Sequence, residues 1–102
     1  MSFGPLEDTY ALRAEYRRLT SEVLPAQADD DWPVHADHYF QRIVLDSLFD
    51  GVWYDHVDGR PAVERLTADE LRTAIDLAAS MLNDPERARE LNDRSLAYRR
   101  DA

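Results

Sequence analysis

The longest apolar stretch of the chain, residues 35–53, places its hydrophobic side chains at helical spacing. At about 100° per residue they fall into two groups on opposite sides of a helix: Tyr39, Phe40, Ile43 and Val44 in one, and Leu45, Leu48, Phe49 and Val52 in the other. A helix that is apolar on most of its circumference is normally enclosed by other elements. The pattern therefore predicts a central helix that begins near His35 and runs at least to Asp50, with a further turn possible through Trp53.

The polar positions of this stretch form a pattern of their own. They follow one another at spacings of three, four, four and four residues: His35, His38, Arg42, Asp46 and Asp50. Such spacing puts their side chains on one line along a helix, where neighbours can touch. A polar line on an otherwise apolar helix marks either a buried ion pair or a binding site.

The first part of the chain has the pattern of an amphipathic helix. Its apolar residues recur at helical spacing: Leu6, Tyr10, Leu12, Tyr16, Leu19 and Val23. Pro5 suits the first turn because it lacks an amide that would be unpaired there. We expect residues 1–4 to be a loose end, and we expect the helix to stop at or before Leu24, because Pro25 disfavours the α conformation in the residue ahead of it.

Two segments have the composition of connections. Residues 25–34 hold two prolines around three successive aspartates and are predicted to form an acidic loop. Residues 57–66 contain Asp58-Gly59 and Arg60-Pro61, pairs that are typical of turns.

The C-terminal part predicts a pair of helices. Thr67 and Glu70 have the spacing of a capping box, the most reliable helix boundary in the sequence. The helix behind it is apolar on one face up to Leu82. Asn83 or Asp84 then caps a last helix that has Pro85 in its first turn.

No segment shows the two-residue alternation of a strand, and the chain has only three glycines for hairpin turns. A length of 102 residues suits a single core. The sequence therefore predicts an all-α fold: one compact four-helix domain over residues 1–102, with the 35–53 helix in the middle.

Composition adds several exclusions. With 44% hydrophobic and 32% charged residues the chain lies in the globular range. No apolar run approaches about 18 residues and no leader is recognisable at the N-terminus, so we expect no membrane segment and a cytoplasmic location. The absence of cysteine excludes disulfides, thiolate chemistry and Cys-based metal sites.

The net charge of −9 is concentrated in the middle of the chain, where residues 25–58 hold eight aspartates and one arginine. Such a field repels phosphate backbones, and the arginines of the last helix are interleaved with acidic residues, so we expect no nucleic-acid partner. It would attract a basic protein or a cation, or it is simply a solvated surface. Four neighbouring residues are the candidate partner surface: Asp29, Asp30, Asp31 and Trp32. Trp32 alternatively anchors the loop.

Three interpretations of the polar line remain open, of which the simplest is plain exposure to solvent; the other two give the line a role. In the first of these, Arg42 and Asp46 form a desolvated ion pair that is purely structural. In the second, Arg42 holds an anionic group together with His35 and His38, while Asp46 orients its guanidinium. Trp53 and Arg60 would reach such a ligand site across the bend.

Other chemistry has little support. Histidines three residues apart need further ligands, and the Glu-x-x-His pattern of di-iron bundles does not occur. No serine lies in a glycine-framed elbow, and no glycine-rich phosphate loop is present. We therefore expect no catalytic nucleophile, no metal and no cofactor.

One resemblance covers roughly residues 35–100. The residues that carry it are Phe40, Arg42, Ile43, Asp46, Gly51, Trp53, Arg60, Pro61, Ala62, Leu71, Leu91, Asn92, Ser95, Leu96 and Arg99. This run resembles a group of small bacterial proteins, some of which carry a Gcn5-related N-acetyltransferase label. That label implies a mixed sheet and a glycine-rich loop for coenzyme A, whereas this sequence predicts neither. The resemblance implies a shared cluster of six residues: Arg42, Asp46, Trp53, Arg60, Asn92 and Ser95.

Two functional hypotheses follow. The leading one is a non-enzymatic interaction or accessory protein that forms a homodimer or binds a protein partner through the acidic and aromatic surface at residues 29–32. The rival is a small-ligand-binding protein or enzyme with an anion site on His38, Arg42 and Asp46. The rival predicts a concave pocket that several of the candidate side chains reach.

Overall fold

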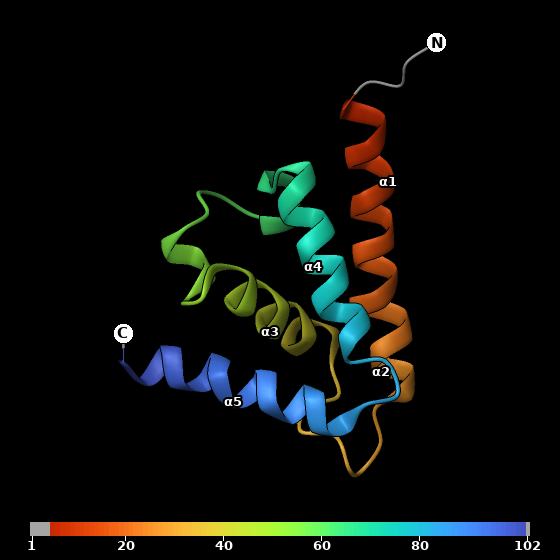
Figure 1. Cartoon of the computed structure of the whole chain (residues 1–102), viewed down its shortest axis with the longest axis vertical. Helices are drawn as coiled ribbons and strands as arrows, with labels where there is room; N and C mark the ends of the chain where they lie inside the picture. The colour runs from red at the N-terminus through yellow and green to blue at the C-terminus, as the bar shows by residue number, and fades with distance from the viewer. Residues whose placement is uncertain (1–4, 102) are drawn as a thin grey trace.

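A computed structural model describes residues 5–101, and every regular element in that range is helical. In Figure 1, α1 (Pro5–Arg18) and α4 (Ala68–Ser80) run side by side, α5 (Pro85–Asp101) crosses below them, and α3 (Asp37–Phe49) lies in the middle. The predicted all-α four-helix fold is confirmed. Residues 1–4, predicted to be a loose end, lie outside the described range. No helix within residues 5–101 is long and apolar enough to cross a membrane.

The first helix is longer than predicted. After α1 the chain continues through a π-helical segment, η1 (Leu19–Val23), into a short α2 (Leu24–Gln27), so Pro25 lies inside the helix. The amide of Leu24 donates to the carbonyl of Leu19, five residues back. This wider turn leaves room for the proline ring, which in a regular α-helix would clash with the carbonyl four residues before it. The prediction that the helix stops by Leu24 is therefore wrong.

The central helix is shorter than predicted. It begins at Asp37, after Ala36 in an extended conformation, and ends at Phe49. Asp50 adopts the left-handed conformation (φ 51°) that ends a helix, a conformation aspartate tolerates better than most residues. Residues 35–53 therefore do not form one helix: Trp53 belongs to a separate 3₁₀ turn, η2 (Trp53–Asp55).

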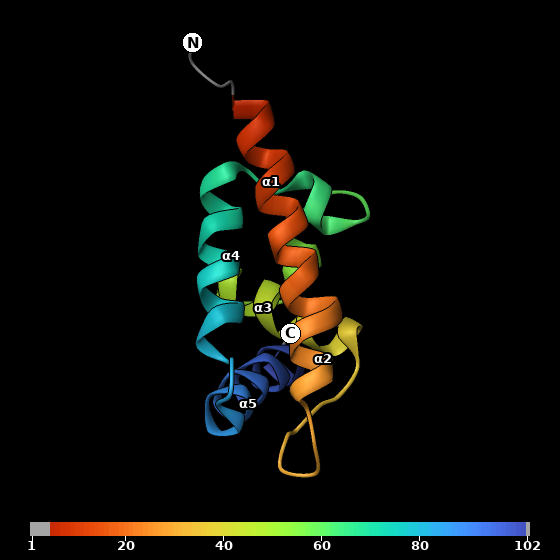
Figure 2. The same cartoon turned by 90° about the vertical axis from the view of Figure 1, so that its right-hand side faces the viewer.

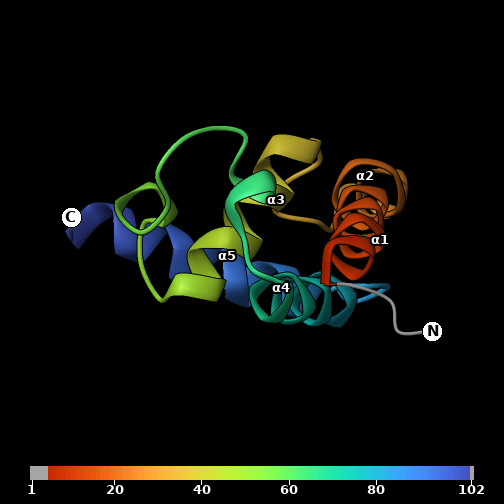
Figure 3. The ribbon, with the colours of Figure 1, turned by 90° about the horizontal axis from the view of Figure 1, so that it is seen from above.

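The connection between α3 and α4 follows the prediction for residues 57–66. Gly59 has a positive φ of 91°, which only glycine adopts readily, and a 3₁₀ turn, η3 (Ala62–Arg65), leads on to α4. Seen from above, this connection forms an arch beside α3 and α4 (Figure 3). The arch brings residues 60–63 over one side of the central helix.

The helix caps of the C-terminal pair are confirmed. The Thr67 amide donates to Glu70 Oε1 at 2.8 Å, and the Glu70 amide donates to Thr67 Oγ1 at 3.2 Å. Between the two candidates for the next cap, the structure selects Asp84, whose Oδ1 accepts from the Arg87 amide at 3.0 Å. Pro85 then begins α5.

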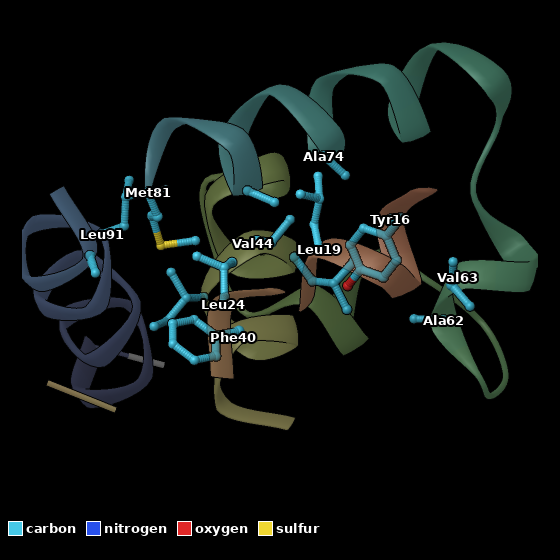
Figure 4. Packing of buried hydrophobic residues seen from close by; sticks show 14 of the residues in the cluster. Tyr16, Leu19, Leu24, Phe40, Val44, Ala62, Val63, Ala74, Met81 and Leu91 are labelled. Carbon is cyan, nitrogen blue, oxygen red and sulfur yellow. The ribbon is translucent and has the colours of Figure 1, made fainter. Parts of the chain in front are cut away.

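The core lies around α3, as predicted for the central helix. α3 packs against α4, α5 and η1, while α1 packs against α4; Figure 2 shows this α1–α4 layer with α3 behind it. Phe40, Ile43 and Val44 have no exposed surface, and burial of each such side chain contributes about 1.5–3 kcal/mol. Figure 4 shows the cluster, with Tyr16 at the end nearest Ala62 and Val63. The acidic loop is fastened to this core by Trp32, whose ring meets that of Phe40 edge to face at 6.0 Å.

Candidate functional site

Asp46 is the buried centre of a polar cluster inside the helical core. Its carboxylate has no exposed surface, and it accepts hydrogen bonds from the Ser95 hydroxyl at 2.6 Å and the Trp53 amide at 3.0 Å. Arg99 completes the set, donating from Nε to Oδ2 at 2.9 Å and from Nη2 to Oδ1 at 3.2 Å. A bidentate pair of this kind fixes the guanidinium in position. Asp46 therefore joins α3 to α5 and to the start of η2.

Arg42 lies one turn before Asp46, but its hydrogen-bond partner is a different residue. Its Nη2 donates to Asn92 Oδ1, and its guanidinium lies over the Tyr39 ring, 5.5 Å from the centroid. The Arg42–Asp46 ion pair expected from their spacing is thus replaced by an Arg99–Asp46 pair. The reason is that α5 packs against this face of α3 and offers both a neutral acceptor for Arg42 and a competing guanidinium for Asp46.

Among the described residues, no carboxylate contacts the charged group of Arg42. Its Nε is buried and has no hydrogen-bond partner within the described chain. Burial lowers the pKa of the Arg42 guanidinium from its ordinary value, and the nearby charge of Arg99 lowers it further. An anion placed beside Arg42 would relieve both effects, because it would stabilise the charged form.

Two further arginines are held by aromatic rings at the same side of α3. Arg60 lies over the Trp53 ring, 5.2 Å from the centroid, and Arg99 lies over the Tyr54 ring at 5.5 Å. Both distances are within the cation–π range. Each guanidinium is therefore oriented by an aromatic ring, and the ring does not neutralise the positive charge of the arginine.

These side chains line a half-open cleft of about 870 Å³. The lining comes from α1 and η1 (Tyr16, Arg17, Ser21), from α3 (His38, Tyr39, Gln41, Arg42, Leu45), from η2 (Trp53, Tyr54), from the arch (Arg60, Pro61, Ala62, Val63) and from α5 (Arg99). No acidic residue is among them. The cleft thus gathers four of the twelve arginines on a protein whose net charge is −9.

Tyr16, one of the residues that line the cleft, carries a buried hydroxyl. Tyr16 is only 2% exposed, and its hydroxyl has no hydrogen-bond partner among the described residues. Burial raises the pKa of Tyr16 above its ordinary value, so the group stays neutral and can donate a hydrogen bond. An unsatisfied buried polar group costs about 1–3 kcal/mol, a cost that an acceptor on a ligand would remove.

The structure brings together most of the site residues predicted from the sequence. His38, Arg42, Trp53 and Arg60 line the cleft, and Asp46 lies beneath it. His35 does not belong to the group, because it precedes α3 and its Nε2 lies 2.8 Å from the carbonyl oxygen of Asp29 in the acidic loop. The six residues emphasised by the resemblance fall into two contacting groups. Arg42 contacts Asn92, whereas Asp46 contacts Ser95 and Trp53, and Trp53 in turn contacts Arg60.

Most of the cleft lining was not predicted from the sequence. Tyr16, Arg17, Tyr39, Tyr54 and Arg99 were not predicted as site residues. One signal was present for Arg99: Asn92, Ser95 and Arg99 follow at spacings of three and four, which puts them on one line of α5 facing the polar line of α3. Nothing in the local sequence distinguishes the others, since their common location depends on the packing of separate elements.

The predicted partner surface is acidic but not aromatic. Asp29, Asp30 and Asp31 are exposed, whereas Trp32 is 7% exposed and packs in the core. Trp32 is therefore the anchor of the loop, the second of its two predicted roles, and its ring is not on the surface.

Comparisons of the chain with protein-family models, with curated proteins and with solved structures find no match. The site itself therefore indicates what the protein can bind.

Proposed function

We propose that the protein binds a small organic anion in the cleft between α1, α3 and the arch. The observation that carries the proposal is the set of three lining arginines, Arg17, Arg42 and Arg60, that have no contacting carboxylate among the side chains described, residues 9–101. An arginine fork is suited to carboxylate and phosphate oxygens, and clustered guanidiniums repel one another unless an anion lies between them.

Preorganisation of the cleft supports the proposal. Asn92 and Tyr39 orient Arg42, Asp46 fixes Arg99, and Trp53 holds Arg60. Side chains that are already ordered lose little conformational entropy when a ligand binds. Tyr16, which lines the cleft, adds a neutral donor through its buried hydroxyl.

Thermal unfolding with added anions tests the proposal. The protein is melted with phosphate, citrate, benzoate or ribose 5-phosphate, each against chloride at equal ionic strength. A ligand at 100 times its Kd stabilises the folded state by about 2.7 kcal/mol, which for a domain of this size raises the Tm by roughly 10–20 °C. If every anion gives the same Tm as chloride, the proposal is wrong.

Two variants locate the binding. Arg42→Gln should abolish most of the anion-dependent rise in Tm, whereas Arg100→Gln, which removes an equal charge from an exposed position on α5 outside the cleft, should retain it. Tyr16→Phe should weaken binding without lowering the stability of the ligand-free protein, because the hydroxyl it removes has no partner there. Equal losses in Arg42→Gln and Arg100→Gln would indicate only a general effect of net charge.

A further inference from the structure

The charge balance of the cleft indicates how much negative charge its ligand carries. Of the four lining arginines, Arg99 alone is matched by a contacting carboxylate among the residues that the structure describes, that of Asp46. Three positive charges are left, and a monocarboxylate would balance one of them. A phosphate monoester carries about −1.5 to −2 at neutral pH and offers three acceptor oxygens, so it fits the cleft better.

The charge of the remaining surface limits the length of the ligand. The chain has 21 acidic residues and twelve arginines; four of the arginines but none of the described acidic residues line the cleft, which leaves the surface around it acidic. A polyanion such as a nucleic-acid strand would leave the cleft and meet this acidic surface, which repels it. The cleft volume of about 870 Å³ is within the range of sites for small molecules. The ligand is therefore a short anion that ends inside the cleft.

The rings of the cleft indicate the shape of the rest of the ligand. Tyr39 and Tyr54 are 42% and 52% exposed, so both rings keep open surface although each has an arginine over it. Trp53 meets Tyr54 edge to face, with the ring centroids 5.7 Å apart and the ring planes at 83°. Exposed aromatic faces of this kind stack planar rings, as they do in sites for single-stranded nucleic acids.

We propose that the ligand is a phosphate monoester joined to a planar heterocycle, the chemical class of the nucleoside monophosphates. The inference rests on the proposed anion binding and adds the ring to it. Its phosphate lies among Arg17, Arg42 and Arg60, and its ring stacks at the Trp53–Tyr54 side of the cleft. No glycine-rich loop is needed, because arginine side chains from separate elements supply the donors.

Calorimetric titration with three probes separates the ring from the phosphate. AMP carries both parts, ribose 5-phosphate lacks the base, and adenosine lacks the phosphate. We expect AMP to bind about 5- to 150-fold more tightly than ribose 5-phosphate, the range that stacking of one base supplies. Adenosine should bind more weakly than either.

A pair of tyrosine variants tests where the base lies. Tyr54→Leu removes a half-exposed ring from the cleft and should reduce the preference for AMP to about threefold or less while leaving the affinity for ribose 5-phosphate unchanged. Tyr10→Leu is the matched control, because Tyr10 is 74% exposed on α1 and is not part of the lining. A preference for AMP that persists in Tyr54→Leu would overturn this placement of the ring.

The outcomes distinguish this inference from the proposal beneath it. If ribose 5-phosphate or phosphate binds but AMP binds no more tightly, the inference that the ligand carries a stacked heterocycle is wrong, and the proposed anion site is supported. If citrate alone binds, the ligand is a polycarboxylate and the phosphate ester is wrong. If no probe and no anion of the thermal panel binds, both proposals fail.

Discussion

Replacing the buried Asp46 with asparagine should destabilise the protein severely. The substitution keeps the size of the side chain but removes the charge that pairs with Arg99, and it sets an amide NH₂ against one of the donors that now reach the carboxylate, Ser95 or Arg99. Loss of one partner from a buried ion pair costs about 3–5 kcal/mol. The Arg99 side chain is 29% exposed, so water can partly hydrate its unpaired charge, and we expect the lower end of that range.

The expected loss is large compared with the whole stability of a domain of this size, about 5–15 kcal/mol. At about 4–8 °C per kcal/mol, a loss of roughly 3 kcal/mol lowers the Tm by about 12–24 °C. Urea unfolding followed by circular dichroism gives the free energy, and an unchanged m-value shows that the same cooperative transition is being measured.

Asp50→Asn is the matched control for Asp46→Asn. It removes the same charge from the same helix end, but Asp50 is exposed, and asparagine adopts its positive φ as readily. It loses only the 3.2 Å hydrogen bond from the Tyr98 hydroxyl, so we expect a change within about 0.5 kcal/mol. Equal and small losses in the two variants would refute the assignment of Asp46 as the buried link between α3 and α5.

Three other variants test the account by chemical unfolding. Raising the pH above about 10 should destabilise the wild type, because Tyr16 loses its proton in the unfolded chain but keeps it when buried in the folded protein. The Tyr16→Phe variant should therefore lose less stability than the wild type between pH 8 and pH 11. An equal loss in the two proteins would contradict the raised pKa of Tyr16. Trp32→Ala should lower the free energy of unfolding by about 3–5 kcal/mol, since it removes a core side chain packed on Phe40. A change below about 1 kcal/mol would indicate that Trp32 lies on the surface. Thr67→Ala should cost about 1 kcal/mol through loss of the capping box, against little change in Thr73→Ala on an exposed face of the same helix; equal effects would show that the cap contributes nothing.

The helices were predictable because their signals are local. The capping box at Thr67 fixes the start of α4 within its own four residues, and the apolar circumference of residues 39–49 marks α3 as central. Pro25 misled the prediction for the first helix, because a π-helical turn accommodates a proline that would end a regular helix.

The site was predictable only in part. Spacing placed Arg42 and Asp46 on one face, but it could not show that α5 would supply Asn92 and Arg99 as their partners. That choice depends on which helix packs on this face, and hence on the whole core. The cleft arises in the same way, from segments that are far apart in the sequence. Self-association or a protein partner stays a prediction, for which light scattering of the purified protein is the measurement.

The central claim, that the arginines of the cleft bind a small anion, is tested most directly by NMR of the arginine side chains. In a titration of ¹⁵N-labelled protein with AMP, the Nε–H signals of Arg17, Arg42, Arg60 and Arg99 should shift with a single Kd. The signal of Arg72, which pairs with Asp69 on the exposed face of α4, should stay in place. Saturable shifts confined to the four cleft arginines are the predicted result. Equal shifts at Arg72 and Arg42, or shifts that never saturate, would contradict the claim.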